Sequence, residues 1–458
     1  MRKVMSRDSL TSIELRAISG LAGLYGLRML GLFMVLPVLP LLLHEFAGAT
    51  PMAIGLAIGI YGLTQALLQL PFGWLSDRFG RKPLIYCGLL LFTLGSVVAA
   101  TADSMFWLIV GRALQGTGAI ASVLMALLAD LTRDERRTQA MATVGISIGL
   151  AFIVAMAAGP WLASLLGLSG LFWLTAVLST LGMLVVWRWV PTPDRIRRHL
   201  DAGIDTARIS DVLRHPQLLR LDFSILVLHL LLTGVFVAIP GLLLEAGWSL
   251  SQHGWIYLIT MLAGFFAMIP LIIIGEKGRK MKAMLLLAVF LLALALAILP
   301  LSLSGWVMLP GLWVFFIGFN LLEASLPSLI SKQSPVEAKG TAMGIYSTSQ
   351  FLGAFLGGVL GGLVLTHWGA QELLWSASLL CLIWLLVLLG FRQPRHLSSR
   401  VFSLTITAAE ELQALKHQLL STPGVVEVVF LAEEATGYLK LDRQQLDEPA
   451  LDRLLGKH

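Results

Sequence analysis

The sequence contains little charge and almost no cysteine. Only 13% of its 458 residues are Asp, Glu, Lys or Arg, whereas 57% are hydrophobic. In soluble domains roughly a quarter of the residues are charged. The two cysteines, Cys87 and Cys381, lie in apolar runs and form no C-x-x-C pair, which excludes a thiolate metal site and a disulfide framework. A soluble core could not bury this much apolar surface, so the composition indicates a membrane protein.

The signatures of several other protein classes are missing too. The net charge of +6 could suggest a nucleic-acid partner, but the basic residues lie in short segments between apolar runs, which is typical of membrane topology. The sequence contains no Ser-His-Asp set, phosphate-binding loop or metal-ligand cluster. We therefore expect neither an enzyme nor a resident metal or cofactor, and we interpret the glycine-rich stretch 353–362 as helix packing.

Twelve apolar runs are long enough to cross a bilayer, for which a helix needs about 20 residues. The first is too long for the apolar core of a signal peptide, which has about 7–15 residues, so we interpret it as an uncleaved span. The predicted spans are 18–43, 53–75, 84–100, 105–131, 140–166, 171–190, 221–244, 254–274, 284–301, 306–329, 342–365 and 373–391.

Basic residues occur in every second loop only. The loops after the even-numbered spans hold clusters such as 78–82 and 133–137, whereas the intervening loops contain no Lys or Arg. Because basic loops stay cytoplasmic, we expect a multi-pass protein of the inner membrane with both termini in the cytoplasm. This orientation requires an even number of spans.

The longest polar loop divides the spans into two sets of six. We expect an N-terminal six-helix bundle over 1–190, a central cytoplasmic loop with one short amphipathic helix over 191–220, and a C-terminal six-helix bundle over 221–392. A separate domain is expected over 401–458. Transporters built from two repeated halves have this organisation.

The loop after the second predicted span carries a ten-residue motif, Gly73-Trp-Leu-Ser-Asp77-Arg78-Phe-Gly80-Arg81-Lys82. It resembles the signature loop G-x-x-x-D-R-x-G-R-K of the major facilitator superfamily. In physical terms, Gly80 makes a tight turn that places Asp77 and Arg81 for charge-assisted hydrogen bonds. The alternative is an ordinary turn in a basic loop.

Two further groups extend this motif into a cluster. Asp77 could also sit at the positive N-terminal end of the eleventh helix, near Gly340, and Asp130 at the end of the fourth helix is a second anionic partner for Arg81. We expect this cluster to latch the two halves on the cytoplasmic side and to release when they move. A partial echo in the second half, 275–280, has Glu276 in place of Asp77.

Other spans carry weaker signatures of the same superfamily. Residues 112–118 resemble its R-x-x-Q-G-x-G motif, and 30–40 resemble the first-helix signature of its twelve-span drug/proton antiporters. The fifth span resembles the antiporter signature at four positions, although generic small-residue packing is the alternative. These four are Gly145, Gly149, Gly159 and Pro160. The resemblance covers about residues 15–392 and implies an all-α fold of two six-helix bundles that works by alternating access.

Ionisable residues inside spans are costly and usually functional. Glu323 is the one carboxylate well inside a span, and we expect it to carry the coupling proton, with Arg28 or Arg112 as counter-charge. A purely structural buried pair is the alternative, and Arg112 could instead reach toward the outer interface. Asp222 and His229, on one face of the seventh helix, are weaker candidates, and Asp222 could simply reach the inner surface.

Uncharged polar side chains within spans are candidates for lining a cavity. Hydrogen bonding between helices is an equally good interpretation. The candidates are Gln65, Gln69, Gln115, Asn320 and Gln350.

After residue 393 the pattern becomes that of a small α+β domain. Strands are predicted over 401–407, 425–431 and 437–441, and helices over 408–420 and 444–455. This order is ferredoxin-like without the last strand, and it resembles heavy-metal-associated domains. The C-x-x-C of those domains is replaced by residues 407–410, Thr-Ala-Ala-Glu, which excludes thiolate copper binding. The open sheet edge could pair with a second copy or dock on basic loops; a passive appendage is the alternative.

The resulting hypothesis is a secondary transporter that exports small or drug-like molecules in exchange for protons. Its partners would be the lipid bilayer, a small-molecule substrate and protons, with no nucleic acid. One alternative is a facilitator or importer of a metabolite on the same fold. Another is a membrane sensor that signals through the C-terminal domain.

Overall fold

The computed structural model describes residues 10–42, 46–193, 206–301, 304–335, 338–393, 397–404, 409–431, 436–442 and 445–455. Much of the predicted central loop, and positions 407–408 of the C-terminal domain, lie outside these ranges.

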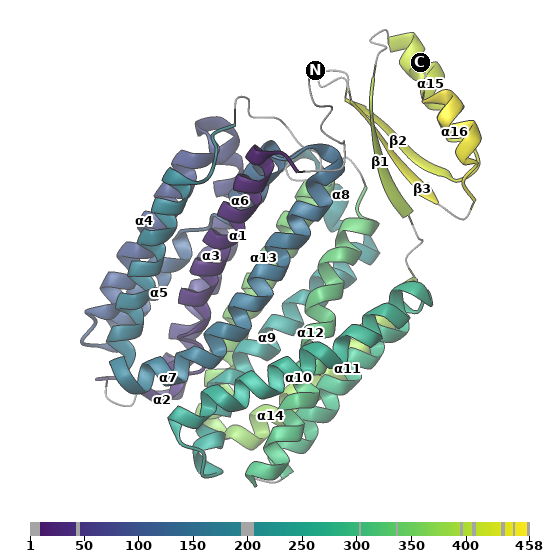
Figure 1. The fold of residues 1–458 in the computed structure, drawn as a ribbon. Helices are drawn as coiled ribbons and strands as arrows, with labels where there is room; N and C mark the ends of the chain where they lie inside the picture. The colour runs from purple at the N-terminus through teal and green to yellow at the C-terminus, as the bar shows by residue number, and fades with distance from the viewer. Residues whose placement is uncertain are drawn as a thin grey trace.

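The N-terminal half consists of long antiparallel helices (Figure 1). They are α1 (Ser12–Phe33), α2 (Leu39–Leu42), α3 (Pro51–Phe79), α4 (Arg81–Ala100), α5 (Met105–Thr117), α6 (Ala121–Asp130) and α7 (Asp134–Arg188). The C-terminal half follows a short α8 (Ile209–Leu213) with α9 (Pro216–Glu245), α10 (Leu250–Lys277), α11 (Met281–Ile298), α12 (Gly305–Gln333), α13 (Lys339–His367) and α14 (Ala370–Leu389).

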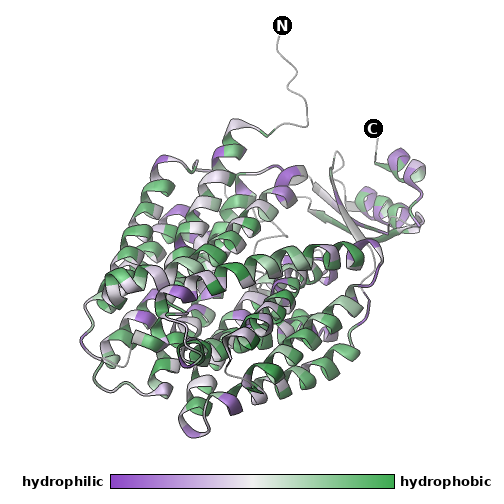
Figure 2. Ribbon diagram, turned by 60° about the horizontal axis from the view of Figure 1, so that its bottom comes forward, coloured by the Kyte–Doolittle hydropathy of each residue, from purple (hydrophilic) through white to green (hydrophobic). Residues whose placement is uncertain are grey.

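The described helices account for twelve membrane crossings. Ten helical stretches are long and apolar enough to span a membrane. One of them, Gln139–Arg188, contains Gly167 at φ 67°, a left-handed conformation that divides α7 into two spans. The remaining span lies within α1, whose first turns carry Glu14 and Arg16 ahead of the apolar run and whose apolar run contains Arg28. Hydrophobic residues predominate along these helices, as the hydropathy colours of Figure 2 show.

Two spans predicted as continuous helices are interrupted. The first breaks after Phe33, and the chain resumes as the short α2. The fourth breaks at Gly118, where α5 ends and the helix restarts at Ala121. The fully buried Arg28 donates from Nη2 to the Gly118 carbonyl oxygen at 2.7 Å, so the break exchanges a helical hydrogen bond for one from a guanidinium group. The sequence pattern missed both breaks because the flanking residues remain apolar.

The two halves meet where α3 and α13 cross, near the end that lacks basic loops (the opposite end). A Cβ built on Gly55 would collide with the Gly358 carbonyl oxygen, and one on Gly358 would collide with that of Gly55. A Cβ on Gly59 would come within 2.7 Å of the Phe355 carbonyl oxygen, and one on Gly362 within 2.5 Å of that of Pro51. Glycine is required at this crossing because the helix backbones touch.

The buried apolar residues show the same division between the two ends. Residues of the N-terminal half near the opposite end, such as Leu36, Phe152 and Met156, belong to one continuous core with the whole C-terminal half. Toward the end that carries the basic loops (the basic end), the N-terminal half has a separate core around Leu24, Leu89 and other residues. The halves therefore share a core at the opposite end and have separate cores at the basic end.

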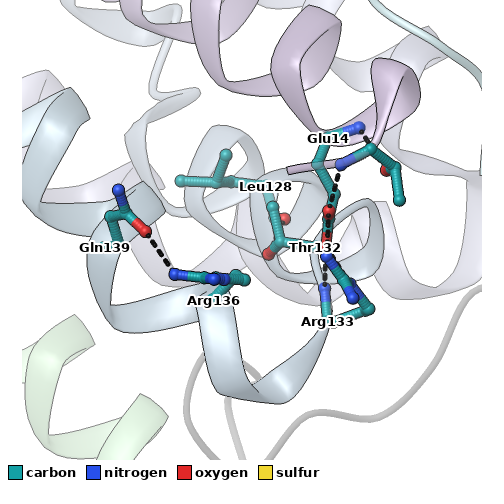
Figure 3. Close-up of polar contacts among 7 residues, drawn as sticks. Glu14, Leu128, Thr132, Arg133, Arg136 and Gln139 are labelled. Atoms are coloured by element: carbon teal, nitrogen blue, oxygen red, sulfur yellow. Dashed lines mark hydrogen bonds and ion pairs between the residues drawn. The ribbon is translucent and has the colours of Figure 1, made fainter. Parts of the chain in front are cut away.

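At the basic end, α1 is tied to the connection between α6 and α7 (Figure 3). Arg133 donates from Nε to Oε1 of Glu14 at 2.8 Å and from Nη2 to Oε2 at 2.9 Å. Thr11 completes a capping box with Glu14 at the start of α1. The Arg133 guanidinium holds the pKa of the buried Glu14 carboxyl at about 2. The sequence analysis missed this pair because Glu14 precedes the predicted span.

The C-terminal domain has the predicted β-α-β-β-α order. It comprises β1 (Leu397–Ser403), α15 (Ala409–Ser421), β2 (Val425–Leu431), β3 (Thr436–Asp442) and α16 (Glu448–Leu454). The antiparallel sheet has the order β1-β3-β2, and both helices lie on one side of it (Figure 1). The first strand begins four residues before the predicted start at 401. The predicted fold class, twelve membrane helices in two bundles plus a small α+β domain, is confirmed.

The glycine contact gives a first prediction. Gly358→Val should force α3 and α13 apart, because its side chain meets the Gly55 backbone. Spin labels at the exposed Phe106 and Trp306, near the opposite end of each half, should report longer distances than in the parent protein. Gly145→Val is the matched control, since nothing lies within 4 Å of a Cβ built there. Equal distance distributions in both variants would contradict the account.

The Glu14–Arg133 pair gives a second prediction. Glu14→Gln should lower the thermal midpoint in detergent at pH 7, because it removes a buried charge-assisted pair worth about 2 kcal/mol when one partner is partly exposed. Since the pKa of Glu14 is depressed, its contribution is fully present above the unfolded value of 4.5 and is lost as the pH falls toward about 2. The midpoints of parent and variant should therefore converge over this window. A difference that does not depend on pH would contradict the assignment.

Candidate functional site

Three polar side chains from different helices meet inside the C-terminal half. The Gln350 amide nitrogen lies 2.8 Å from His229 Nε2 and 3.4 Å from Glu323 Oε1. His229 Nε2 is 3.9 Å from Glu323 Oε2. Glu323 lies ten residues before the end of α12, or roughly 15 Å along the helix. Its side chain is 38% exposed although Oε2 itself is buried, so part of this side chain borders open space deep within a span.

The triad can hold one proton in two positions, on His229 Nε2 or on the Glu323 carboxylate. In the observed geometry the Gln350 amide donates to His229 Nε2, which requires a neutral imidazole. A proton on Nε2 would break that hydrogen bond and give His229 a donor that faces the Glu323 carboxylate. The arrangement can therefore move a proton between imidazole and carboxylate with only a small rotation of the Gln350 amide.

A second carboxylate, that of Asp222, lies on the same face of α9 as His229 and closer to the basic end. Asp222 is 5% exposed, and neither of its oxygens has a partner among the described residues. Tyr346 of α13 lies within electrostatic range of both Asp222 and Glu323, and its buried hydroxyl also has no described hydrogen-bond partner. An ionised carboxylate in such a place costs several kcal/mol, so Asp222 is a second group that gains from binding a proton. It does not reach the surface of the protein.

The predicted counter-charges are not brought to Glu323. Arg28 donates to the Tyr61 hydroxyl and the Gln65 carbonyl within the N-terminal half, in addition to the Gly118 carbonyl. Arg112 is buried, donates to the Ala57 carbonyl and to Gln115, and lies over the Tyr61 ring. Within the described part of the chain neither guanidinium has a carboxylate within 4 Å. Arg112 does not extend to the outer interface either.

The predicted cavity residues separate into two groups. Gln65, Gln69 and Gln115 are buried. Gln65 accepts from Arg28 of α1 at 3.0 Å and donates to Gln69 of its own helix at 3.1 Å, and Gln115 joins α5 to α4 through Ser96 at 2.8 Å. Gln350 belongs to the Glu323 triad. Asn320 is partly buried and makes one long contact, 3.5 Å, with the Met261 carbonyl. The geometry thus favours helix bonding in the N-terminal half and a polar site in the C-terminal half.

The signature loop forms its cluster within the N-terminal half. Gly80, at φ 98°, ends α3 and begins α4. Arg81, in the first turn of α4, pairs with Asp77 and donates from Nε to Asp130 Oδ2 at 3.0 Å and from Nη1 to Ser76 at 2.7 Å. Among the described residues no hydrogen bond joins Asp77 to the start of α13. The expected bridge to Gly340 is therefore absent in this state.

The remaining motif residues have mixed surroundings. Gly73 is buried in α3, whereas Arg78 is exposed and lies near the Trp74 and Phe79 rings. Gly159 packs on the Met34 backbone, next to the buried Pro160. The expected packing role of Gly145 and Gly149 is wrong for this state, because a Cβ on either would meet nothing within 4 Å.

The sequence analysis missed two residues of the polar sites. Tyr346 stands four residues before Gln350, so the polar pair on one face of an apolar helix was an available signal. Lys332 donates to Glu276 at 2.7 Å and ties the ends of α12 and α10 together, a pairing that the echo motif at 275–280 did not reveal. The described residues contain no cluster of His, Cys, Asp and Glu able to hold a metal ion.

Comparison with known proteins agrees with this architecture. The chain is 47% identical over 397 residues to the inner membrane transport protein YajR of Escherichia coli, covering 86% of this chain and 87% of the relative. It is 25% identical to the class B tetracycline resistance protein of E. coli, over 78% and 92% of the two chains. The crystal structure of the human organic anion transporter MFSD10 superposes with a TM-score of 0.65 at 21% identity, over 82% and 100% of the chains.

The family profile described as Major Facilitator Superfamily matches residues 21–353 and, in a second alignment, 221–426. Together with the identity to YajR, this match covers most of the chain and confirms the resemblance seen in the sequence motifs. The family consists of membrane transporters rather than enzymes. This chain belongs to the Major Facilitator Superfamily.

Proposed function

We propose that the protein is a proton-coupled exporter of small, drug-like molecules, in which Glu323 carries the coupling proton together with His229 and Gln350. The observation that supports the proposal is a partly exposed glutamate side chain deep in α12 whose carboxylate oxygens face an imidazole and an amide. Relatives named for multidrug and tetracycline resistance support a drug-like cargo.

The proposed orientation places the basic end in the cytoplasm. Basic loops favour that side, and the polar tail emerges at the same end. The halves act as two units, 1–190 and 221–392, joined by 191–220. The helix contact at the opposite end closes the periplasmic side, while the separate cores at the basic end leave the triad accessible from the cytoplasm. Cargo would enter from this side as the triad releases its proton.

Asp222 is proposed to carry the released proton toward the cytoplasm. It lies six residues into α9, or roughly 9 Å from the basic end, and is thus nearer to that end than Glu323. The Tyr346 hydroxyl is within electrostatic range of both acids. When the halves rock, Asp77 would reach the start of α13 at Gly340, and the Asp77–Arg81–Asp130 cluster would then hold the basic end closed.

Two other functions fit the same fold. A facilitator or importer would use the triad to bind cargo without moving protons. The structural neighbours that transport organic anions and nucleosides support this candidate. A sensor acting through the C-terminal domain would need that domain for its response, whereas a transporter should keep turnover when residues from 397 onward are removed.

The proposal predicts the effect of Glu323→Gln. In proteoliposomes loaded with a pH-sensitive dye, tetracycline or ethidium should drive proton movement through the parent protein. Glu323→Gln should reduce this flux at least about tenfold, because Glu323 is the carboxylate of the triad and its loss removes the group that binds the proton. Asp222→Asn should slow the flux less. Glu245→Gln, an exposed carboxylate at the opposite end of α9, should leave it unchanged.

Two results would decide against the proposal. If Glu323→Gln exchanged protons at the parent rate, Glu323 would not be the carrier. If the parent protein moved cargo equally fast with and without a pH gradient, the facilitator would be the better description.

A further inference from the structure

The sheet of the C-terminal domain has one face that its own helices do not cover. Leu439 and Leu441 of β3 face α15 and α16, as the domain core of Leu419, Leu451 and other residues shows. Side chains alternate along a strand, so Tyr438 and Lys440 point to the other side. Val429 and Glu427 of β2 stand opposite these two residues in the register and share that side. We call this set the helix-free face.

The helix-free face is nevertheless buried. Val429 is 7% exposed, Tyr438 3% and Lys440 6%, although both described helices of the domain lie on the other side (Figure 1). A lysine in this position is rarely buried unless its ammonium group has partners. The face is therefore covered from outside the domain's own core.

Lys440 shows what the face contacts. Its ammonium group donates to the backbone carbonyl of Ser334, the residue that caps the C-terminal end of α12, and it lies 3.5 Å from Glu427 Oε2. The last carbonyls of a helix lack helical partners and form the negative end of its dipole, so a cation is favoured there. Glu427 holds the ammonium in place from within the sheet.

Ser334 lies in the connection between α12 and α13, which we call the corner. Two residues earlier, Lys332 ties α12 to Glu276 of α10. Five residues after Ser334 begins α13, whose first residues are the expected target of the Asp77 loop and whose glycine face closes the opposite end. A domain seated on Ser334 therefore restrains the corner from which α13 begins.

We propose that the helix-free face is a docking surface for the corner between α12 and α13 of the same chain, and that the docked domain stabilises the state seen here. With the corner held, the start of α13 stays away from Asp77 and the basic end stays open. Undocking frees the corner, so that the basic end closes more often. The inference rests on two halves that rock, as the family implies, and is independent of cargo and of proton coupling.

The docking is tested by cross-linking. In a background with Cys87 and Cys381 replaced by Ser, a short amine-to-thiol cross-linker should join Ser334→Cys to Lys440 within one chain, because Lys440 binds the backbone carbonyl of residue 334, which the substitution keeps. Mass spectrometry should find no link from Ser334→Cys to Lys416, because Lys416 is exposed on the other side of the domain. A 334–440 link found only in dimers would overturn the proposal in favour of docking between two copies, and no 334–440 link would overturn it altogether.

The conformational effect is tested on the full chain with spin labels. Labels at the exposed Gln139 and Lys277 report the separation of α7 and α10 at the basic end. Lys440→Met should shift the ratio of closed to open populations about tenfold toward the closed state, as expected for loss of one charged hydrogen bond. Lys416→Met should leave the ratio unchanged. Equal populations in the two variants, or a shift of Lys440→Met toward the open state, would overturn the proposal whatever the outcome for Glu323.

Discussion

The direct contact of two helix backbones, α3 and α13, is the constraint on which the rest of the structure depends. In a bilayer the apolar side chains gain little from leaving lipid for another helix, so close packing must come from van der Waals contact between small residues. Helix α13 provides two glycine faces: Gly353 and Gly357 pack on α9, while Gly358 and Gly362 pack on α3. One helix is thereby fixed within its own half and also closes the opposite end.

The charges inside the two halves are arranged unequally, and this follows from their surroundings. The buried cations Arg28 and Arg112 bind carbonyl oxygens, amides and aromatic rings rather than carboxylates, although Nε and Nη1 of Arg28 have no hydrogen-bond partner among the described residues. Both oxygens of Asp222 and Oε2 of Glu323 have no hydrogen-bond partner among the described residues, while Oε1 of Glu323 accepts from Gln350. A guanidinium stays protonated, whereas a carboxylate can bind a proton. Of these four groups, the two that can change protonation state therefore lie in the C-terminal half.

The sequence was sufficient to predict the helices and the signature loop, but not the pairing of side chains between helices. Hydropathy locates spans because lipid imposes it residue by residue, and the loop at 73–82 is local, so Gly80, Asp77 and Arg81 could be placed together. The partners of Glu323 come from α9 and α13, and Arg28 turned toward Gly118 rather than toward Glu323, because the break in the fourth span created a carbonyl acceptor nearby. Such acceptors arise from backbone geometry, which an apolar pattern does not record. Lys440 is a further case, since its partner is the end of another helix.

The signature loop and the C-terminal domain converge on one short segment, the start of α13. Asp77 can stabilise that helix end only when the basic end closes, because its carboxylate must reach the free amides of the first turn. Lys440 acts on the preceding carbonyl end of α12, and the observed geometry satisfies this contact while Asp77 has no described bond to α13. Lys440 thus favours the position of the corner seen here, whereas Asp77 favours its position when the basic end is closed. The two charges act from opposite sides of the α12–α13 connection. The residues at this single corner would thus contribute to the balance between the two states alongside the apolar interface at the opposite end, because each charged hydrogen bond is formed in one state and lost in the other.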